Sequence, residues 1–153
     1  MATPTPFEIN CALMAGCADQ EARPNNVNRF PVPAAYELNL RQTSLTGFEA
    51  NIYKNGNQIV ISFSPTNLSL AYLGDVAADI CMGMGSANMQ LLQAAELYLF
   101  IKNSTPDVNE YIFTGHSLGG GLAALMGVLF NEKAVVFDPA PFDKAATEPT
   151  ATK

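Results

Sequence analysis

Three small residues spaced two apart, Gly115, Ser117 and Gly119, form the part of this sequence best suited to covalent chemistry. Residues 111–114 are β-branched or aromatic and predict a buried strand. Residues 122–130 are apolar and rich in Leu and Ala, which predicts a helix. A strand that reverses sharply into a helix strains its central residue and leaves no room for side chains two positions away. The pattern therefore predicts a nucleophile elbow that exposes the Ser117 hydroxyl at the top of a sheet.

The bare G-x-S-x-G pattern is weak evidence by itself. Glycine and serine frequencies produce it by chance in on the order of one chain in twenty of this length. Chance does not account for the strand before it, the helix after it, or the two further glycines, Gly120 and Gly121. Glycines at these positions allow the helix to pack closely on the sheet. We therefore interpret the pattern as an elbow.

Two segments of the chain resemble the class 3 lipases, a branch of the α/β-hydrolases. Residues 113–123 (FTGHSLGGGLA) are similar to the signature of that family. Residues 59–67 (IVISFSPTN) resemble its strand ending in F-R-G-T, with Ser64-Pro65 in place of Arg-Gly. The resemblance extends over roughly residues 47–142. It implies a partial α/β-hydrolase fold, with a mostly parallel sheet, helices on both of its faces and the C-terminal part of the fold missing.

Length and composition predict a single domain over residues 1–153, and the resemblance implies that it is a truncated lipase-like domain. Hydrophobic residues make up 48% of the chain and charged residues 14%, which is typical of a globular domain. The net charge of −6, without a basic cluster, argues against nucleic acid as a partner. The longest apolar run, residues 122–130, is too short for a transmembrane segment. The N-terminus lacks the basic region of a cleavable signal peptide, which leaves the cytoplasm or a signal-independent secretion route.

We expect no metal ion and no other cofactor. The single histidine, His116, lies inside the elbow, and the three cysteines, Cys11, Cys17 and Cys81, form no C-x-x-C pair. Cys11 and Cys17 lie six residues apart in an apolar segment, so they can pair only if that segment is not one continuous helix. We interpret them as buried thiols.

Hydrophobic periodicity and turn residues predict the remaining elements. Besides the elbow helix, helices are predicted at residues 7–20, 76–81 and 87–102, and strands at residues 48–54, 59–63, 111–114 and 134–137. Asn55-Gly56 is a strong hairpin signal between the first two strands, and residues 35–45 carry no clear pattern. Right-handed crossovers make the last three strands parallel, so their carboxyl ends meet at one edge. Thr66, Ser117 and Asp138 follow those ends.

The chemistry expected at this edge is acyl transfer. Ser117 is the candidate nucleophile, and the Leu118 N–H, at the start of the helix, is the first candidate oxyanion donor. The resemblance implies Thr66 as the second oxyanion donor, because Pro65 has no N–H. The alternative for Thr66 is an ordinary turn residue.

A general base is missing from this arrangement. The order of the triad in this fold is Ser, acid, His, yet His116 directly precedes Ser117 and is expected to pack beneath the turn as a structural residue. In the class 3 lipases the acid and the histidine lie beyond the strand that corresponds to residues 134–137. Asp138, at the end of that strand, is the remaining candidate acid, although the family places its acid one strand later.

The leading hypothesis is a serine ester hydrolase that cleaves acylglycerol or phospholipid esters through an acyl-enzyme on Ser117. The alternative is a catalytically inactive hydrolase-fold module that binds a lipid or a protein. A third hypothesis is a thioesterase or another acyltransferase that uses the same elbow. Missing C-terminal strands leave a sheet edge and apolar helix faces uncovered, which favours self-association or a larger parent chain.

Overall fold

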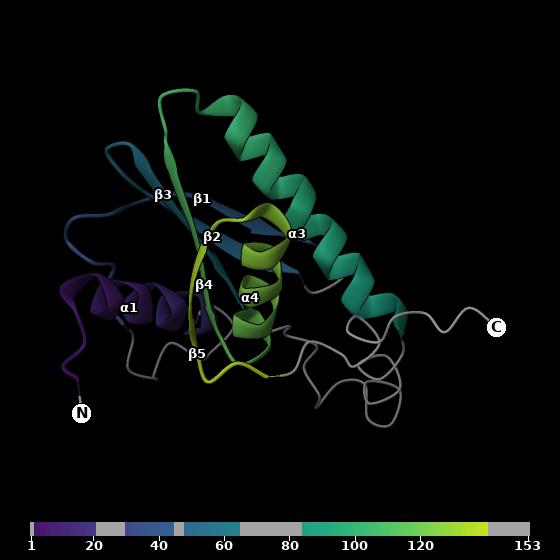
Figure 1. The fold of residues 1–153 in the computed structure, drawn as a ribbon, viewed down its shortest axis with the longest axis horizontal. Coiled ribbons are helices and arrows are strands. Elements are labelled where there is room, and N and C mark those ends of the chain that lie inside the picture. Colours follow the sequence, from purple (N-terminus) through teal and green to yellow (C-terminus); the bar gives the residue numbers. More distant parts are fainter. Residues whose placement is uncertain (1, 21–29, 45–47, 65–83, 141–153) are drawn as a thin grey trace.

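The computed structural model describes residues 2–20, 30–44, 48–64 and 84–140 of this chain (Figure 1). The predicted helix at residues 76–81, as well as Thr66 and Cys81, lies outside these ranges. Within them, a five-stranded sheet follows the order of the chain. Its strands are β1 (Glu37–Thr43), β2 (Glu49–Asn55), β3 (Gln58–Phe63), β4 (Glu110–His116) and β5 (Lys133–Phe137).

The sheet is mixed, with an antiparallel half and a parallel half. β1, β2 and β3 pair antiparallel, whereas β3, β4 and β5 pair parallel. The parallel strands are the three predicted to be so, and the hairpin between β2 and β3 turns at the predicted Asn55-Gly56. Gly56 has φ 58°, the left-handed conformation that such turns require. β1 has no predicted counterpart, because all seven of its residues are exposed and therefore carry no buried, alternating face.

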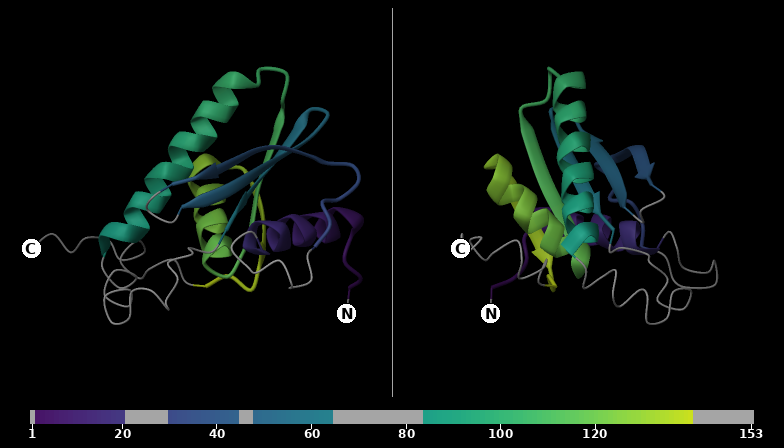
Figure 2. Two further views of the ribbon diagram at one scale, coloured as in Figure 1. Left: turned by 180° about the vertical axis from the view of Figure 1, so that it is seen from behind. Right: turned by 90° about the vertical axis from the view of Figure 1, so that its right-hand side faces the viewer.

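Helices cover both faces of the sheet, as predicted (Figure 2). α1 (Pro6–Gln20) packs on one face, while α3 (Met84–Ser104) and α4 (Leu118–Phe130) pack on the other. The larger core lies under α3 and α4, where the Phe113 ring lies 5.9 Å from the Phe63 ring and 5.2 Å from the Tyr98 ring, measured between centroids. In β4, Ile112 faces α1 and Phe113 faces α3 and α4. A strand buried on both faces is expected to be apolar throughout, which explains the continuous apolar run of β4.

α1 begins at Pro6, one residue before its predicted start, although the prolines at residues 4 and 6 suggest irregular structure there. Thr5 caps the helix: the Glu8 N–H donates to Thr5 Oγ1 at 3.2 Å, and the Thr5 N–H donates to Glu8 Oε2 at 2.7 Å. This reciprocal pair is a capping box, and Pro6 suits the first helical position because its missing N–H has no helical acceptor. The same contacts lower the pKa of Glu8, with the backbone hydrogen bond from Thr5 as the largest cause.

The two N-terminal cysteines are buried thiols, as predicted. α1 is one continuous helix, and Cys11 and Cys17 are not joined to each other. Burial raises the pKa of Cys11 to about 11, so its thiol is protonated and unreactive at neutral pH. The Cys17 thiol donates to the Phe30 carbonyl at 3.2 Å. These residues thus serve packing on the α1 face of the sheet.

Candidate active site

The carboxyl ends of β3, β4 and β5 lie at one edge of the sheet. The three strands run parallel and in register. Ser64, Ser117 and Asp138 are the first residues after them. This is the edge at which open α/β sheets bind ligands. The predicted convergence is confirmed for Ser117 and Asp138, whereas Thr66 lies outside the described ranges.

Ser117 occupies the turn between β4 and α4 in a strained backbone conformation. Its φ is 55° and its ψ is −123°. A positive φ is uncommon for a residue with a side chain, and this ψ lies far from the left-handed helical region. The Ser117 side chain is half-buried and makes no capping hydrogen bond to α4. The hydroxyl is therefore not engaged by the first turn of its own helix.

The two glycines that flank Ser117 are required by packing. A Cβ on Gly115 would lie 2.8 Å from the Gly120 nitrogen and closer still to the Gly119 carbonyl. A Cβ on Gly119 would lie 2.9 Å from the Phe63 carbonyl carbon and closer still to its oxygen. All of these neighbours are backbone atoms, which cannot swing aside as a flexible side chain does. The predicted need for glycine is thus confirmed at both positions.

The first turn of α4 offers backbone donors at this edge. Leu118 begins the helix, and the N–H groups of a first helical turn have no acceptor within the helix. The first intrahelical bond runs from the Gly121 N–H to the Ser117 carbonyl at 3.0 Å. The contact of Gly119 with Phe63 and Ser64 places the segment after β3 against the same turn.

The segment after β5 holds Ser117 from the other side. The Ser117 N–H donates to the Phe137 carbonyl at 3.1 Å, and the Ala140 N–H donates to the Ser117 carbonyl at 2.9 Å. Asp138, between these two partners, has φ 44° and an exposed side chain. Sequence reasoning missed Phe137 and Ala140, because a main-chain hydrogen bond leaves no signature in residue type. The role of Asp138 as the acid stays a prediction.

His116 ends β4 on the face of the sheet that α1 covers. It pairs with Phe137, which packs with the residues under α1. Because Ile112 faces α1 and side chains alternate along a strand, His116 faces α1 as well. Its side chain is half-buried, whereas α4 and its N-terminus lie on the opposite face. This position suits the structural role expected for His116.

The described ranges contain no cluster of three or more His, Cys, Asp or Glu side chains that could hold a metal ion. Among the helices described here, none combines the length and the apolar character needed to cross a bilayer.

The fold and the site together define a lipase-like α/β-hydrolase. Its strained serine lies between a strand and a glycine-rich helix, at the carboxyl edge of the parallel strands. Solved lipases share this fold. The lipase from Rhizopus microsporus var. chinensis matches with a TM-score of 0.53 and 19% identity, over 89% of this chain and 58% of that one. Lipase II from Rhizopus niveus matches with a TM-score of 0.52 and 18% identity, over 84% and 57%.

Sequence comparison narrows this class to one family. The model of the Tle-like phospholipase domain matches residues 15–151, and the chain belongs to that phospholipase-like family. The extracellular phospholipase A1 of Serratia liquefaciens is 32% identical over 113 residues, which cover 71% of this chain and 34% of the relative. The chain thus spans about a third of the length of that relative. The resemblance to class 3 lipases among the α/β-hydrolases is thereby confirmed.

Proposed function

We propose that this domain supplies the nucleophile, Ser117, for the hydrolysis of a phospholipid carboxylic ester. The observation that carries the proposal is the strained Ser117 backbone between two glycines that admit no Cβ. Such a turn is costly to maintain, and it persists where it presents a reactive side chain. Membership of a phospholipase-like family, and similarity to a phospholipase A1, support a phospholipid over an acylglycerol as the substrate.

The proposed reaction proceeds through an acyl-enzyme. Ser117 Oγ attacks the ester carbonyl carbon while a general base takes its proton. The Leu118 N–H and a second donor, Thr66, bind the oxyanion that forms. The tetrahedral intermediate then collapses, and the leaving alcohol receives the proton from the base. Water attacks the acyl-enzyme in the same manner, which releases the fatty acid and restores Ser117.

We propose that the general base is a histidine outside residues 1–153. His116 is the only histidine of this chain, and it faces α1, on the side of the sheet opposite α4. A base must lie within hydrogen-bonding reach of the hydroxyl whose proton it takes. His116 does not suit that role.

The nucleophile is tested in the longest natural polypeptide that contains these residues. Ser117→Ala is expected to lower kcat/KM for a short-chain aryl ester and for a phospholipid by several orders of magnitude, because nucleophile and base act as one unit. The thermal unfolding midpoint is expected to stay within about 2 °C of the parent value, since the substitution removes one half-buried hydroxyl and no core side chain. Ser104→Ala, which alters an exposed serine at the end of α3, is the matched control and retains full activity. Turnover by Ser117→Ala at the parent rate contradicts the proposal.

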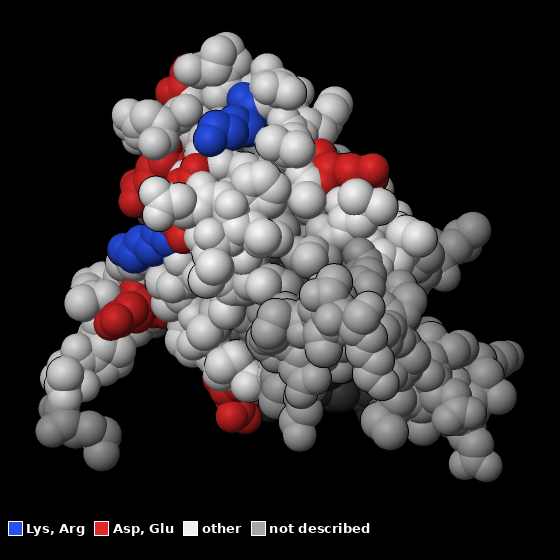
Figure 3. Space-filling model, turned by 45° about the vertical axis from the view of Figure 1, so that its right-hand side comes forward, with Lys and Arg blue, Asp and Glu red and all other residues white. Residues whose placement is uncertain are grey.

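The second candidate is a catalytically inactive module that binds a lipid or a protein. The position of the sole histidine on the α1 face favours it. Apolar side chains on α3 and α4 are also exposed, among them Phe100 at 64% and Val128 at 80%. On the face drawn in Figure 3, uncharged side chains make up most of the described surface. Uncharged, apolar surface of this kind is typical of a contact with a partner.

An activity test of residues 1–153 alone shows whether this chain lacks a general base or contains one that has not been recognised. Without a base, this chain is expected to show no appreciable ester turnover and only slow labelling by a fluorophosphonate. Sedimentation is expected to show a species larger than a monomer. Rapid stoichiometric labelling of Ser117 would show that the chain contains its own base. If the longest natural polypeptide is inactive as well, the binding module is the better description.

A further inference from the structure

We propose that Asp138 positions the elbow through its left-handed backbone, and that its carboxylate is not the acid of a triad. The inference rests on the proposed function in one respect: Asp138 matters for catalysis only if Ser117 is the nucleophile. Its geometric content concerns only the short segment that follows β5. Residues 137–140 run beside Ser117 and supply two of the hydrogen-bond partners of its backbone, in addition to the Gly121 N–H of α4.

The two hydrogen bonds depart by one residue from a regular parallel ladder. The Phe137 carbonyl accepts from the Ser117 N–H, in the manner of a continued parallel ladder. The Ala140 N–H then returns to the Ser117 carbonyl at 2.9 Å. The β4–β5 register would take this bond from residue 139, but Pro139 has no N–H, so Asp138 and Pro139 must together bring the Ala140 N–H to the Ser117 carbonyl.

Pro139 restricts the backbone conformations that can produce this one-residue departure. Pro139 holds its own φ near −65° and disfavours the right-handed helical region for the residue before it. An extended Asp138 would continue the ladder and place Pro139, which has no N–H, opposite the Ser117 carbonyl. The left-handed region is what remains, and Asp138 has φ 44°. Aspartate and asparagine enter this region more readily than other residues with side chains.

The side chain of Asp138 does not match the role of the acid in a catalytic triad. The aspartate of a catalytic triad is buried and hydrogen-bonded to the imidazole that it orients. Asp138 is exposed, and the sole histidine, one strand away, faces α1. The feature of Asp138 that the structure uses is thus its backbone conformation.

Two sets of contacts hold Ser117 in place, the hydrogen bonds from residues 137–140 and the close packing of Gly119. Gly119 abuts Phe63 on the side of β3, and residues 137–140 bind Ser117 on the side of β5. Ser117 is therefore held between the two neighbouring strands. A serine with φ 55° needs such support, because a residue held in a strained conformation persists only where its surroundings over-determine it.

Amide hydrogen exchange in residues 1–153, measured by NMR, tests the proposal without requiring turnover. Asp138→Val is expected to reduce protection of the Ala140 amide by about tenfold or more, because a β-branched residue rarely adopts a positive φ. Asp138→Asn and Asp138→Gly are expected to keep the protection within about twofold of the unmodified chain, since both residues tolerate the left-handed region. The two conservative variants separate backbone conformation from carboxylate charge.

The matched control is Asn131→Val. Asn131 also has a left-handed backbone, with φ 53°, but it ends α4, far along the helix from Ser117. This variant introduces similar strain and is expected to leave the Ala140 amide protected relative to the rest of the sheet. The comparison excludes a general loss of stability as the cause of faster exchange at Ala140.

Two results would overturn the inference. One is unchanged Ala140 protection in Asp138→Val, which would mean that the segment reaches Ser117 without a left-handed residue. The other is equal loss of protection in Asp138→Asn and Asp138→Val, which would assign the effect to the carboxylate. Neither result depends on whether Ser117→Ala abolishes turnover, so failure of the inference and failure of the proposed hydrolase function are observed separately.

Discussion

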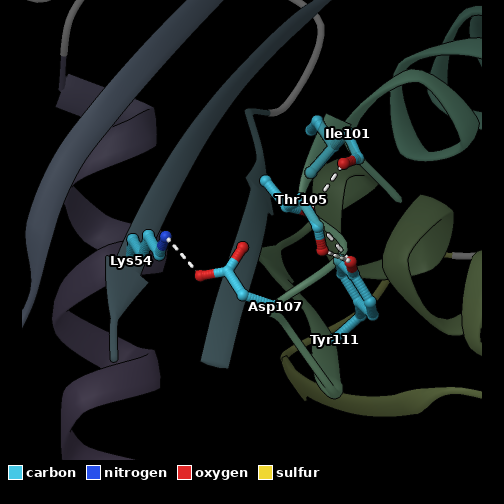
Figure 4. A network of polar contacts seen from close by, with 5 residues as sticks. All are labelled: Lys54, Ile101, Thr105, Asp107 and Tyr111. Carbon is cyan, nitrogen blue, oxygen red and sulfur yellow. Dashed lines mark hydrogen bonds and ion pairs between the residues drawn. The ribbon is translucent and has the colours of Figure 1, made fainter. Parts of the chain in front are cut away.

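Different kinds of contact hold the two ends of the parallel strands, the amino edge and the carboxyl edge. At the amino edge of the parallel strands, side chains make several of the contacts (Figure 4). Lys54 lies 3.4 Å from Asp107, and Thr105 Oγ1 donates to the Ile101 carbonyl at 2.7 Å and lies 2.9 Å from the Tyr111 hydroxyl. At the carboxyl edge, backbone packs against backbone around Ser117. Side chains can adjust to a substitution, whereas main-chain atoms held by a sheet and a helix cannot. We therefore expect the carboxyl edge to be the less tolerant of the two.

Glycine shows the same contrast. Gly56, in the hairpin at the amino edge, has φ 58° and would meet nothing within 4 Å if it carried a Cβ. Gly119, at the carboxyl edge, would place that Cβ against the Phe63 carbonyl. The first glycine is needed for its conformation, the second for its size. The same residue type thus answers two physical requirements in one domain.

The largest effect is expected from Gly119→Val. Strain and overpacking coincide at this position, so we expect the free energy of unfolding to fall by at least about 3 kcal/mol. For a domain of this size that corresponds to a fall in Tm of roughly 10 °C in calorimetry. Gly115→Val is expected to behave alike. Unchanged melting temperatures in both variants would show that the turn is an ordinary one.

A smaller effect is expected from Gly56→Ala. The hairpin leaves room for the methyl group, so only the cost of a left-handed backbone remains, about 1 kcal/mol. Gly56→Asn is expected to cost less than Gly56→Ala, because asparagine tolerates that conformation. Urea unfolding of both variants measures the difference. A loss at Gly56 as large as the loss at Gly119 would remove the contrast between the two edges.

The smallest effect is expected from Asp107→Asn. This change removes the charge that faces Lys54, whose side chain is 31% exposed while that of Asp107 is 68% exposed. Exposed ion pairs contribute about 0–1 kcal/mol, and we expect the loss of unfolding free energy to disappear in 1 M NaCl, where screening is strong. Urea unfolding at low and high salt provides the measurement. A loss that persists in high salt would indicate that the contact is more than an ion pair.

Sequence patterns predicted most of the scaffold around Ser117. The strand, turn and helix of the elbow, the parallel order of β3, β4 and β5, and the hairpin at Gly56 are all local or follow from the handedness of crossovers. Two elements escaped prediction for physical reasons. β1 carries no buried face, and the capping box of Thr5 and Glu8 lies in a segment whose prolines suggested irregular structure.

By itself, the sequence determined that a serine would stand between a strand and a helix with glycines where side chains do not fit. The requirement at Gly115 arises within the turn itself, so residue type and spacing express it, whereas the requirement at Gly119 comes from Phe63 on the neighbouring strand. Tertiary structure alone decided which face His116 occupies, and it decided that Ser117 would bind the backbone of residues 137–140. These outcomes depend on the register between β4 and β5, and on main-chain groups that every residue carries alike.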